Sequence, residues 1–397
     1  MNSQSKITKG GLKPILLFFS LLILASSCKR ANILPSTDII CSEQDSSSNH
    51  PKAAEFASII DKYVKQGLPG ISVLVEDEHG TWVGSGGYVD IENGIKYKPC
   101  HISKAASITK LLVGTLTLKL QEQGKLNIED PISKYIDAKI LNKIDKAEGK
   151  TLHQLMNHTT GIYDVITSSS FYLAVLNNPN KQWTQEELLS YVYGKEGYDL
   201  DSFPAHYSNT NTVLLSMCIE KATGQKHETL LREMVLNPVG MNDTYYQGRE
   251  ELPSTAAQGY YDLHNNGTIS NVSNLITGSG NGYGGIFSNV FDLQAFIKAL
   301  FVDKTILSQA SLDLMQTYVQ EKEDFYTGVS TIKKFTTKSA FGIGHTGRDL
   351  GYSADLFYFP AKNRTMIFFV NYGTNGKSSL KQVFLNFESE LADKVLE

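Results

Sequence analysis

The sequence predicts a mixed α/β fold of the α+β kind: an antiparallel sheet flanked by helices, with an inserted all-helical part. Three observations support this prediction. Strand patterns occur near both ends of the chain, and the long middle stretch lacks long strand patterns but carries several helical runs. The 397 residues, 41% of them hydrophobic, can also bury a large core. We expect both chain ends to build the sheet part, at about 53–105 and 270–397, around a helical insert at about 106–269.

Each element is predicted by its hydrophobic periodicity and by the residues that end it. Helices repeat apolar residues at intervals of three and four and end near glycines such as Gly67, Gly124 and Gly224. Strands are short apolar runs bounded by turn residues such as His79-Gly80. In chain order we expect a helix over 54–64, a hairpin of strands over 71–76 and 81–89, helices over 107–120, 185–193, 211–222 and the second half of 286–301, strands over 341–344, 353–359 and 365–371, and a closing helix over 377–396.

Residues 1–27 predict a signal peptide. Three lysines precede an apolar run over 15–25 that is too short to span a bilayer. Small residues and then Cys28 follow, and this resembles a bacterial lipoprotein signal, in which the cysteine is lipidated. Leucine usually stands three residues before that cysteine, where this chain has Ala25, so an ordinary signal peptide cut after Ser27 is the alternative. In either case we expect export to the cell envelope or periplasm, with a lipid on Cys28 as the only membrane attachment.

Residues 28–52 predict a flexible tether, because few of them are large and apolar. If Cys28 carries lipid, Cys41, Cys100 and Cys218 remain; an odd number cannot all pair internally, so we expect no disulfide framework. Neither CxxC nor HExxH occurs, and we expect no metal and no cofactor. A net charge of −4 with 20% charged residues gives no basic surface for nucleic acid. The oligomeric state stays open.

Ser107 and Lys110 are the first candidates for chemistry. They lie one helical turn apart, so both side chains project from the same face. An amine beside a serine hydroxyl can accept its proton, and a helix N-terminus favours the negative charge that develops there. Ser-x-x-Lys occurs five times in the chain, but only the match at Ser107 opens a long apolar helix in the folded part. Taken alone, a helix-start serine and a surface lysine would be the simpler interpretation.

Two further motifs are candidates, Tyr207-Ser208-Asn209 and His345-Thr346-Gly347. A tyrosinate near Lys110 could act as a general base, and the amide of Asn209 could fix a substrate amide. The second motif precedes a predicted strand, and a strand edge can pair with an extended peptide and aim an N–H at an oxyanion. In isolation, a turn and a polar loop are the simpler interpretations.

Together, the motifs SxxK, YxN and HTG are far more specific than any one alone, because they occur in this order, 100 and 138 residues apart. The chain here resembles the serine beta-lactamase and penicillin-binding protein superfamily, and within it the class C-like branch. Segments 155–162, 237–244 and 284–288 are also similar to that branch, and the resemblance runs from about 53 to 390. It implies the beta-lactamase/DD-peptidase fold.

The resemblance also implies roles for the residues of the first two motifs. Ser107 would be the acylated nucleophile. Lys110 and Tyr207 would act as a coupled pair that takes its proton, with Tyr207 protonating the leaving amine. Asn209 would bind the amide carbonyl of the substrate. His158 and Asp164 lie outside the chemistry of the family, and we interpret both as structural.

The third motif would bind and polarise the substrate. The backbone N–H groups of Ser107 and of Arg348, which follows Gly347, would form the oxyanion hole. His345 and Thr346 would contact the far end of the substrate, often a carboxylate. The side chain of Arg348 could add a carboxylate contact, although an exposed arginine is the simpler interpretation.

The predicted function is therefore that of an exported serine hydrolase acting through a Ser107 acyl-enzyme on D-amino acid peptides, in the manner of a DD-carboxypeptidase. His345 favours this over a class C beta-lactamase, which has lysine at that position. An esterase or beta-lactamase of the same fold is one alternative, and a non-catalytic sensor that binds muropeptides or beta-lactams is another. The expected partners are a small peptide, ester or beta-lactam substrate, without nucleic acid.

Overall fold

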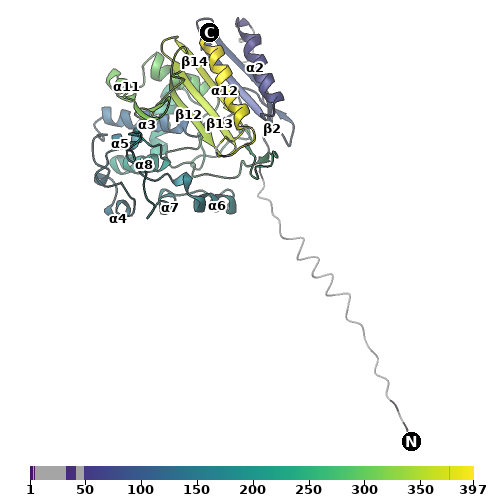
Figure 1. The fold of residues 1–397 in the computed structure, drawn as a ribbon, viewed down its shortest axis with the longest axis horizontal. Helices are drawn as coiled ribbons and strands as arrows, with labels where there is room; N and C mark the ends of the chain where they lie inside the picture. Colours follow the sequence, from purple (N-terminus) through teal and green to yellow (C-terminus); the bar gives the residue numbers. More distant parts are fainter. Residues whose placement is uncertain (3, 5–32, 42–48, 375) are drawn as a thin grey trace. The chain divides into compact units, whose positions relative to one another are not determined.

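The sheet of this protein is built from both ends of the chain, as predicted. The computed structural model describes all residues except 3, 5–32, 42–48 and 375 (Figure 1). It divides into units 1–34 and 35–397, and the fold described below is that of the second unit. The sheet has nine strands in the order β3-β2-β1-β14-β13-β12-β11-β10-β9. The strands are β1 Gly70–Asp77, β2 Gly80–Asp90, β3 Ile95–Lys96, β9 Val319–Lys322, β10 Phe325–Thr327, β11 Ile332–Lys334, β12 Gly342–Asp349, β13 Tyr352–Phe359 and β14 Arg364–Val370.

The antiparallel pairing of β1 with β14 joins the two chain ends. Its register runs from Ile71 opposite Val370 to Glu76 opposite Thr365. The predicted hairpin also forms, with β1 paired to β2 along its whole length. The fold class is therefore confirmed as a mixed α/β fold with a large antiparallel sheet.

Both faces of this sheet are buried against helices. Along β14, Phe368 and Val370 pack in one core with α2 (Ala53–Lys65) and α12 (Lys381–Leu396), which lie side by side in Figure 1. Ile367 and Phe369 alternate with them and pack in the other core. α3 (Ile108–Glu122) and α10 (Val290–Ile297) lie against that second face.

α3 brings catalytic candidates into the core. Twelve of its residues are buried, and a helix that is buried all round belongs to a protein interior. It contacts β12 and β13 of the sheet as well as α8 and α9 of the helical part. Ser107 immediately precedes the helix and Lys110 lies in its first turn, so both residues are held between the sheet and the helical part.

The middle of the chain is mostly helical. α8 starts at Asn209, two residues before the predicted start, and ends at Gly224, whose φ of 71° is the left-handed conformation that glycine favours. The insert is not wholly helical, however, because β5 (Tyr245–Tyr246) pairs with β8 (Ile286–Ser288). The remaining helices here are α4 Ala138–Leu141, α5 Leu152–Met156, α6 Ser169–Asn177, α7 Gln185–Ser190 and α9 His227–Leu231, and α11 Gln309–Met315 follows later in the chain.

The prediction of a tether over 28–52 is wrong for residues 35–41, which pack against the domain. Ser36 is buried, with its N–H donating to Asp90 Oδ2 at 3.0 Å and its hydroxyl to the carbonyl of Ala256 at 2.7 Å. The sequence signal was misleading because this segment is anchored by polar contacts rather than by large apolar side chains. The predicted signal peptide and the lipidation site Cys28 lie outside the described residues.

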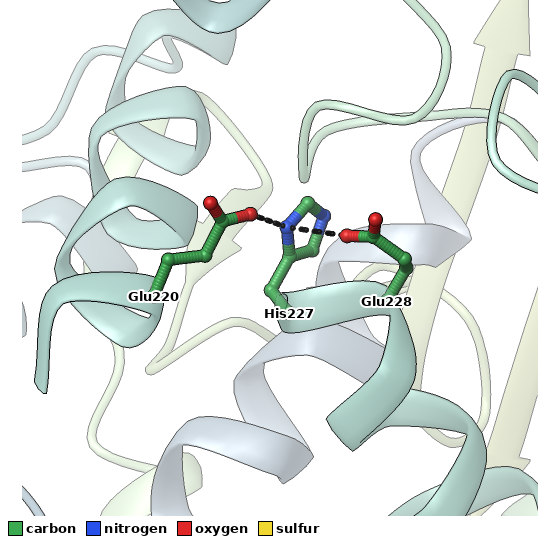
Figure 2. A group of neighbouring side chains, drawn as sticks. All are labelled: Glu220, His227 and Glu228. Atoms are coloured by element: carbon green, nitrogen blue, oxygen red, sulfur yellow. Dashed lines mark hydrogen bonds and ion pairs between the residues drawn. The ribbon is translucent and has the colours of Figure 1, made fainter. Parts of the chain in front are cut away.

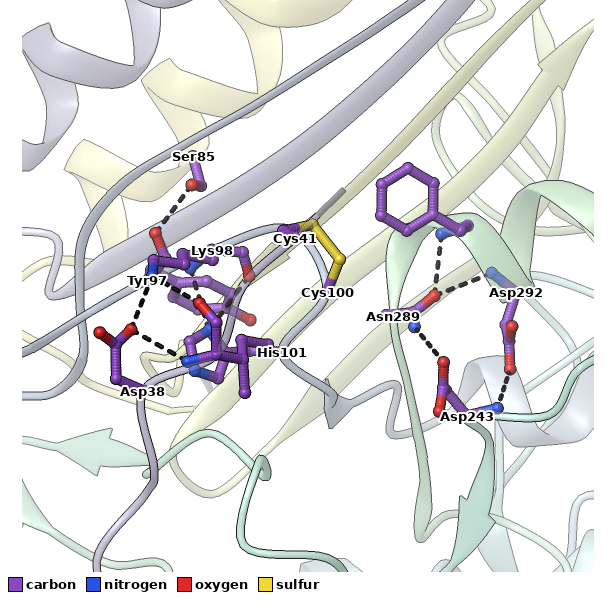
Figure 3. The surroundings of a disulfide bond; sticks show 12 residues. Asp38, Cys41, Ser85, Tyr97, Lys98, Cys100, His101, Asp243, Asn289 and Asp292 are labelled. Carbon is purple, nitrogen blue, oxygen red and sulfur yellow. Dashed lines mark hydrogen bonds and ion pairs between the residues drawn. A yellow bond between two sulfur atoms is a disulfide. The ribbon is translucent and has the colours of Figure 1, made fainter. Parts of the chain in front are cut away.

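We expected no disulfide framework, but Cys41 and Cys100 are bonded to each other (Figure 3). Nearby, Lys98 Nζ lies 2.8 Å from Asp38 Oδ1, and a ring nitrogen of His101 lies 3.0 Å from the carbonyl of Thr37. An odd number of cysteines prevents complete pairing but permits one pair. Among the described residues, no helix is both long and apolar enough to cross a membrane.

Candidate active site

Lys110 is the centre of the site. Its Nζ donates hydrogen bonds to Ser107 Oγ at 3.0 Å, to Asn209 Oδ1 at 2.7 Å and to the carbonyl of Tyr283 at 2.8 Å. Burial lowers the pKa of Lys110 to about 7, while the carboxylates of Asp164 and Asp349 oppose that shift. The three donated hydrogen bonds belong to the ammonium form. A substantial fraction of the amine is neutral near pH 7, and in that form the contact with Ser107 reverses, so that Ser107 Oγ donates to Nζ and can pass its proton to it.

The backbone just before the nucleophile is strained. Ala106 has a φ of 48°, which side chains larger than glycine rarely adopt. Two hydrogen bonds hold this turn: Thr109 Oγ1 donates to the carbonyl of Ala106 at 2.6 Å, and the N–H of Ala105 donates to the carbonyl of Ile286 at 2.8 Å. Such strain persists only where the surrounding structure enforces it, and here the strained turn determines the position of Ser107 at the start of α3.

Tyr207 has a hydroxyl that is free for chemistry. The oxygen is buried and makes no well-formed hydrogen bond among the described residues, but it lies close enough to the Ser107 hydroxyl for that group to lower its pKa. Burial raises the pKa of Tyr207 well above its usual value, and the nearby carboxylates of Asp164 and Glu321 raise it further, while Ser107 acts in the opposite direction. The phenol is therefore protonated at neutral pH, which suits it to donate a proton to a leaving group.

His158 holds the ring of Tyr207. The two rings lie 4.3 Å apart at an interplanar angle of 31°. His158 has a φ of 60°, and its Nδ1 lies 3.3 Å from the N–H of Ser208 and 3.2 Å from Nδ2 of Asn211. Burial lowers the pKa of His158 well below its usual value, so the ring is neutral. We interpreted this residue as structural from the sequence, and its contact with Tyr207 makes it a positioning residue.

Asp164 connects to Lys110 through Asn209. The side-chain Nδ2 of Asn209 lies 3.2 and 3.1 Å from the two carboxylate oxygens of Asp164, and its backbone N–H donates to Oδ1 at 3.0 Å. These bonds fix the amide of Asn209 so that its oxygen faces Lys110. Burial raises the pKa of Asp164, and the hydrogen bonds from Asn209 counteract that rise. Asp164 was also interpreted as structural, and the motif analysis gave no signal for this link because it depends on folding.

The HTG motif lies inside β12, and not before a strand as predicted. β11 pairs only with Gly342–Gly344, so residues 345–349 are paired on one side, to β13, and none of the described strands pairs with the other side. A Cβ at Gly347 would lie 2.0 Å from the carbonyl oxygen of Ala105. The strand therefore passes directly against the backbone that leads to Ser107, and only glycine permits this approach.

His345 and Thr346 point to opposite sides of the strand. Thr346 lines the cavity in front of Ser107. His345 is 2% exposed, its ring centre lies 6.3 Å from that of Tyr207, and its Nδ1 donates to the carbonyl of Thr346 at 2.6 Å. Burial lowers the pKa of His345 to about 3, helped by the charges of Lys110 and Arg348. At neutral pH this residue therefore supplies no positive charge.

Arg348 is not the exposed arginine that we expected. Its guanidinium donates to Asp355 Oδ1 at 2.8 Å and to Glu388 Oε1 at 2.6 Å. Lys334 Nζ bonds the same two carboxylates, at 3.2 Å to Asp355 and 2.5 Å to Glu388. The prediction failed because the two acidic partners of Arg348 lie on β13 and α12, which the sequence pattern does not place beside it. We call these four residues the paired charge cluster.

A cavity of about 530 Å³ opens in front of the nucleophile. Of the predicted residues, Ser107, Tyr207, Asn209, Thr346 and Arg348 line it, and Lys110, His345 and Gly347 do not. A larger hollow of about 1020 Å³ beside α4 is lined by none of these residues. Five side chains, from the N-terminal ends of α3 and α8 and the residues just before them and from β12, thus meet around one space large enough for a small substrate.

Glu220, His227 and Glu228 form the one group of three potential metal ligands in the described part of the chain (Figure 2). His227 Nδ1 lies 2.7 Å from Glu220 Oε1 and 3.3 Å from Glu228 Oε2, and its Nε2 lies 3.3 Å from Tyr246 Oη. Lys226 also lies 3.1 Å from Glu220. His227 donates its Nδ1–H, and Lys226 supplies a neighbouring positive charge. Hydrogen bonds and ion pairs therefore account for this cluster.

The fold and this constellation of serine, lysine and tyrosine define a class of proteins, the serine beta-lactamase and penicillin-binding hydrolases. Residues 56–386 match the Beta-lactamase family. The chain belongs to that family.

Curated relatives and solved structures agree with this assignment. Protein flp of Staphylococcus aureus (strain N315) is 25% identical over 79% of this chain, and the match covers 62% of that protein. Penicillin-binding protein 4* of Bacillus subtilis is 26% identical over 72% of this chain and 64% of its own length. The chain thus spans less than two thirds of the curated relatives that it matches.

A D-stereospecific amidohydrolase from Streptomyces sp. superposes with a TM-score of 0.74 at 25% identity, covering 84% of this chain and 98% of its own. D-amino acid amidase of Ochrobactrum anthropi superposes with a TM-score of 0.76 at 22% identity, covering 86% and 98%.

Proposed function

We propose that this protein hydrolyses amide bonds next to D-amino acid residues through an acyl-enzyme on Ser107. The observation that carries this proposal is the hydrogen bond of 3.0 Å between Ser107 Oγ and Lys110 Nζ, an amine whose pKa burial lowers to about 7. The substrate class is supported by similarity to a D-stereospecific amidohydrolase and to a D-amino acid amidase, which is similarity in fold and not identity of function.

The acylation step follows from the protonation states. Neutral Lys110 takes the proton of Ser107 Oγ as that oxygen attacks the carbonyl carbon, and the carbonyl becomes an oxyanion facing the N–H groups of Ser107 and Arg348. Protonated Tyr207 then gives its proton to the leaving nitrogen, and Lys110 returns a proton to Tyr207. The products of this step are a free amine and an ester on Ser107.

Deacylation uses the same groups with water as the nucleophile. Neutral Lys110 takes a proton from water, the resulting hydroxide attacks the ester carbonyl, and Lys110 gives that proton to Ser107 Oγ as it leaves. An acceptor amine in place of water would give transfer in place of hydrolysis. Because Lys110 and Tyr207 share one site, each proton exchange is a property of the coupled pair and is not assigned to either residue alone.

The experiment that tests this function is intact-protein mass spectrometry. The domain is incubated with a penicillin and, separately, with a D-Ala-D-Ala depsipeptide thioester, beside Ser107→Ala. We expect a covalent adduct on the wild-type protein that is absent from Ser107→Ala. A long-lived penicilloyl adduct with thioester turnover would indicate a DD-peptidase, and rapid loss of that adduct a beta-lactamase. No adduct and no turnover with amides or esters would leave the non-catalytic sensor.

The carboxypeptidase form of this activity needs a contact for the substrate carboxylate. Of the groups expected to supply one, His345 is buried and neutral and Arg348 is engaged by Asp355 and Glu388. Thr346 remains, with its side chain at the cavity. We therefore keep DD-carboxypeptidase activity as one candidate within the proposed class. Its test is to compare the turnover of substrates that carry a carboxylate with that of substrates that carry none.

We also propose that the protein is exported and anchored by a lipid on Cys28. The disulfide between Cys41 and Cys100 supports export, because such bonds persist in oxidising compartments. Burial raises the pKa of the Cys218 thiol, which makes it a poor nucleophile. Globomycin, which inhibits lipoprotein signal peptidase, should leave an uncleaved precursor; normal processing in its presence would contradict the anchor.

A further inference from the structure

Lys104 is a buried cation three residues before the nucleophile. It is the second residue of β4 (Ser103–Lys104), and its side chain is 2% exposed. Its Nζ lies 3.1 Å from Asp349 Oδ2 and 5.5 Å from the centre of the Tyr352 ring. A buried ion pair gains little stability over apolar residues of the same size, so what this pair joins in the fold is the more informative observation.

Asp349 is the last residue of β12 and is held on both of its carboxylate oxygens. Its Oδ2 faces Lys104, and its Oδ1 accepts a hydrogen bond from Thr277 Oγ1 at 2.6 Å. The carbonyl of Thr277 accepts a hydrogen bond from Tyr283 Oη, and the carbonyl of Tyr283 accepts one from Lys110 Nζ at 2.8 Å. A chain of polar contacts therefore runs from the ion pair to the catalytic amine.

The ion pair joins two segments that no pairing between described strands joins. β4 belongs to the three-stranded sheet β4-β8-β5, and β12 belongs to the nine-stranded sheet. The close contact of Gly347 with the carbonyl oxygen of Ala105 prevents a nearer approach of the two segments. The attraction between Lys104 and Asp349 opposes their separation. The two contacts together fix the distance between the chain before Ser107 and the end of β12.

These two segments carry the N–H groups that we propose for the oxyanion hole. Ser107 follows Lys104 by three residues, and Arg348 immediately precedes Asp349. Such donors stabilise an oxyanion when they lie at about 2.7–3.1 Å from its oxygen. A displacement of about 1 Å can slow an enzyme by about 10². The ion pair is therefore placed where it can set the geometry on which acylation depends.

Asp349 also acts on Lys110 through its charge. Burial lowers the pKa of Lys110 to about 7, and the carboxylates of Asp164 and Asp349 act in the opposite direction. The other titratable groups around this amine are uncharged at neutral pH, because burial lowers the pKa of the histidines and raises that of the tyrosines: His158, His345, Tyr207 and Tyr283. The charge balance at Lys110 therefore depends on how far Lys104 compensates Asp349.

We infer that Lys104 and Asp349 are a positioning pair for acylation: their ion pair holds the two oxyanion donors at the reacting distance, and the balance of their charges sets how readily Lys110 accepts a proton. This inference rests on the proposed function of Ser107. Neither side chain of the pair lines the catalytic cavity, so both act through the backbone and through Lys110.

Two single substitutions test the charge balance. Asp349→Asn removes the carboxylate and leaves Lys104 uncompensated, so the pKa of Lys110 falls and the amine is neutral at lower pH. Lys104→Met leaves Asp349 uncompensated, so that pKa rises. We expect the rise of kcat/KM with pH for p-nitrophenyl acetate to move by about 0.5 or more in pH, downward in Asp349→Asn and upward in Lys104→Met. Shifts in the same direction, or no shift, would overturn the inference, because loss of a merely structural contact would not act with opposite signs.

NMR of the protein with isotopically labelled lysine Cε atoms measures the same titration without catalysis. The signal of Lys110 is the one that is absent from Lys110→Arg, and its midpoint should move in the same two directions. The charges of Glu321 and Arg348 on the cavity wall are the same in these variants, so differences between them report the ion pair. If Ser107 forms no acyl-enzyme, this titration still tests the charge balance. If an acyl-enzyme forms and the midpoint stays, only this inference fails.

The double variant Lys104→Met/Asp349→Asn tests the positioning, and it remains informative if a single substitution prevents folding. It leaves no charge unpaired, so its melting temperature should stay close to that of the wild-type protein. Acylation of Ser107 by a penicillin should nevertheless slow by about tenfold or more. Lys298→Met/Glu76→Gln is the matched control, because it removes an ion pair of 3.2 Å whose members do not line the cavity, and it should acylate at the wild-type rate. Wild-type acylation in Lys104→Met/Asp349→Asn, or an equal slowing in both double variants, would overturn the inference.

Discussion

Lys110 illustrates how one buried residue sets the chemistry of the site. The amine is 2% exposed and its three hydrogen-bond acceptors are two side-chain oxygens and one carbonyl, so the cost of desolvating its charge exceeds the compensation that Asp164 and Asp349 give. Spacing in the sequence placed Ser107 and Lys110 on one helix face, but the lowered pKa depends on burial that only the fold creates.

The first prediction concerns pH. The pKa of Lys110 lies at about 7, so the amine is protonated below this pH and neutral above it. We expect kcat/KM for p-nitrophenyl acetate, which carries no amine, to rise with pH and level off above about 7. A pH profile from 5 to 9 measures this. Lys110→Arg should lose activity by roughly 10² to 10⁴, since a guanidinium stays protonated. A profile that is flat through 7 would exclude Lys110 as the base.

The second prediction concerns Asp164, whose carboxylate raises the pKa of Lys110 against the effect of burial. In Asp164→Asn that contribution is lost, so the pKa of Lys110 falls and the rise in activity moves to lower pH. The rate should also fall, because Asn209 loses one of the two carboxylate oxygens that orient its amide. The same pH profile measures both effects. A purely structural Asp164 would lower stability without moving the profile.

At the scale of elements, the apolar patterns of the sequence predicted the strands that pack in the core, but they missed residues 345–349 of β12. The predicted strand stopped at residue 344, whereas β12 extends to Asp349. His345, Thr346 and Arg348 interrupt the apolar pattern because this part of the strand carries the site, where polar side chains replace core residues. The helix start at Asn209 was missed for the same reason, since the YxN motif looks like a turn.

The third prediction tests the close approach of β12 to the nucleophile. Gly347→Ala would place a Cβ 2.0 Å from the carbonyl oxygen of Ala105, so strand and turn must move apart. We expect acylation of Ser107 by a penicillin to slow by about 10² or more, as misplacement by about 1 Å can cost that much. Gly284→Ala is the control, since its nearest atom would be 3.9 Å away. Equal acylation rates in both variants would contradict the assigned geometry.

At the scale of the whole molecule, the fold class followed from the sequence because strand patterns at both chain ends had to share one sheet. Contacts between distant polar segments did not follow. The paired charge cluster joins β11, β12, β13 and α12, and the segment 35–41 lies on the domain through Ser36 and the bond from Cys41 to Cys100. Such contacts leave no periodic signal in the sequence, because each depends on which surfaces the folded chain brings together.

The last prediction concerns this disulfide. The cysteines are 59 residues apart, and cross-linking a loop of that length stabilises a protein by about 4 kcal/mol in the chain-entropy model. Cys41→Ser/Cys100→Ser should therefore unfold at a lower denaturant concentration. Dithiothreitol should shift the wild-type protein in the same direction and leave the double variant unchanged. Cys218→Ser serves as the control, since that thiol is free and buried in α8. The bond lies in the segments next to β4 (Ser103–Lys104), which leads to Ser107.

If hydrogen bonds of Thr109 and Ile286 mainly hold the strained turn at Ala106, the double variant should show a small decrease in the rate of Ser107 acylation beside a large decrease in the free energy of unfolding. A double variant that is as stable as the wild-type protein would show that residues 35–41 are held by their hydrogen bonds alone.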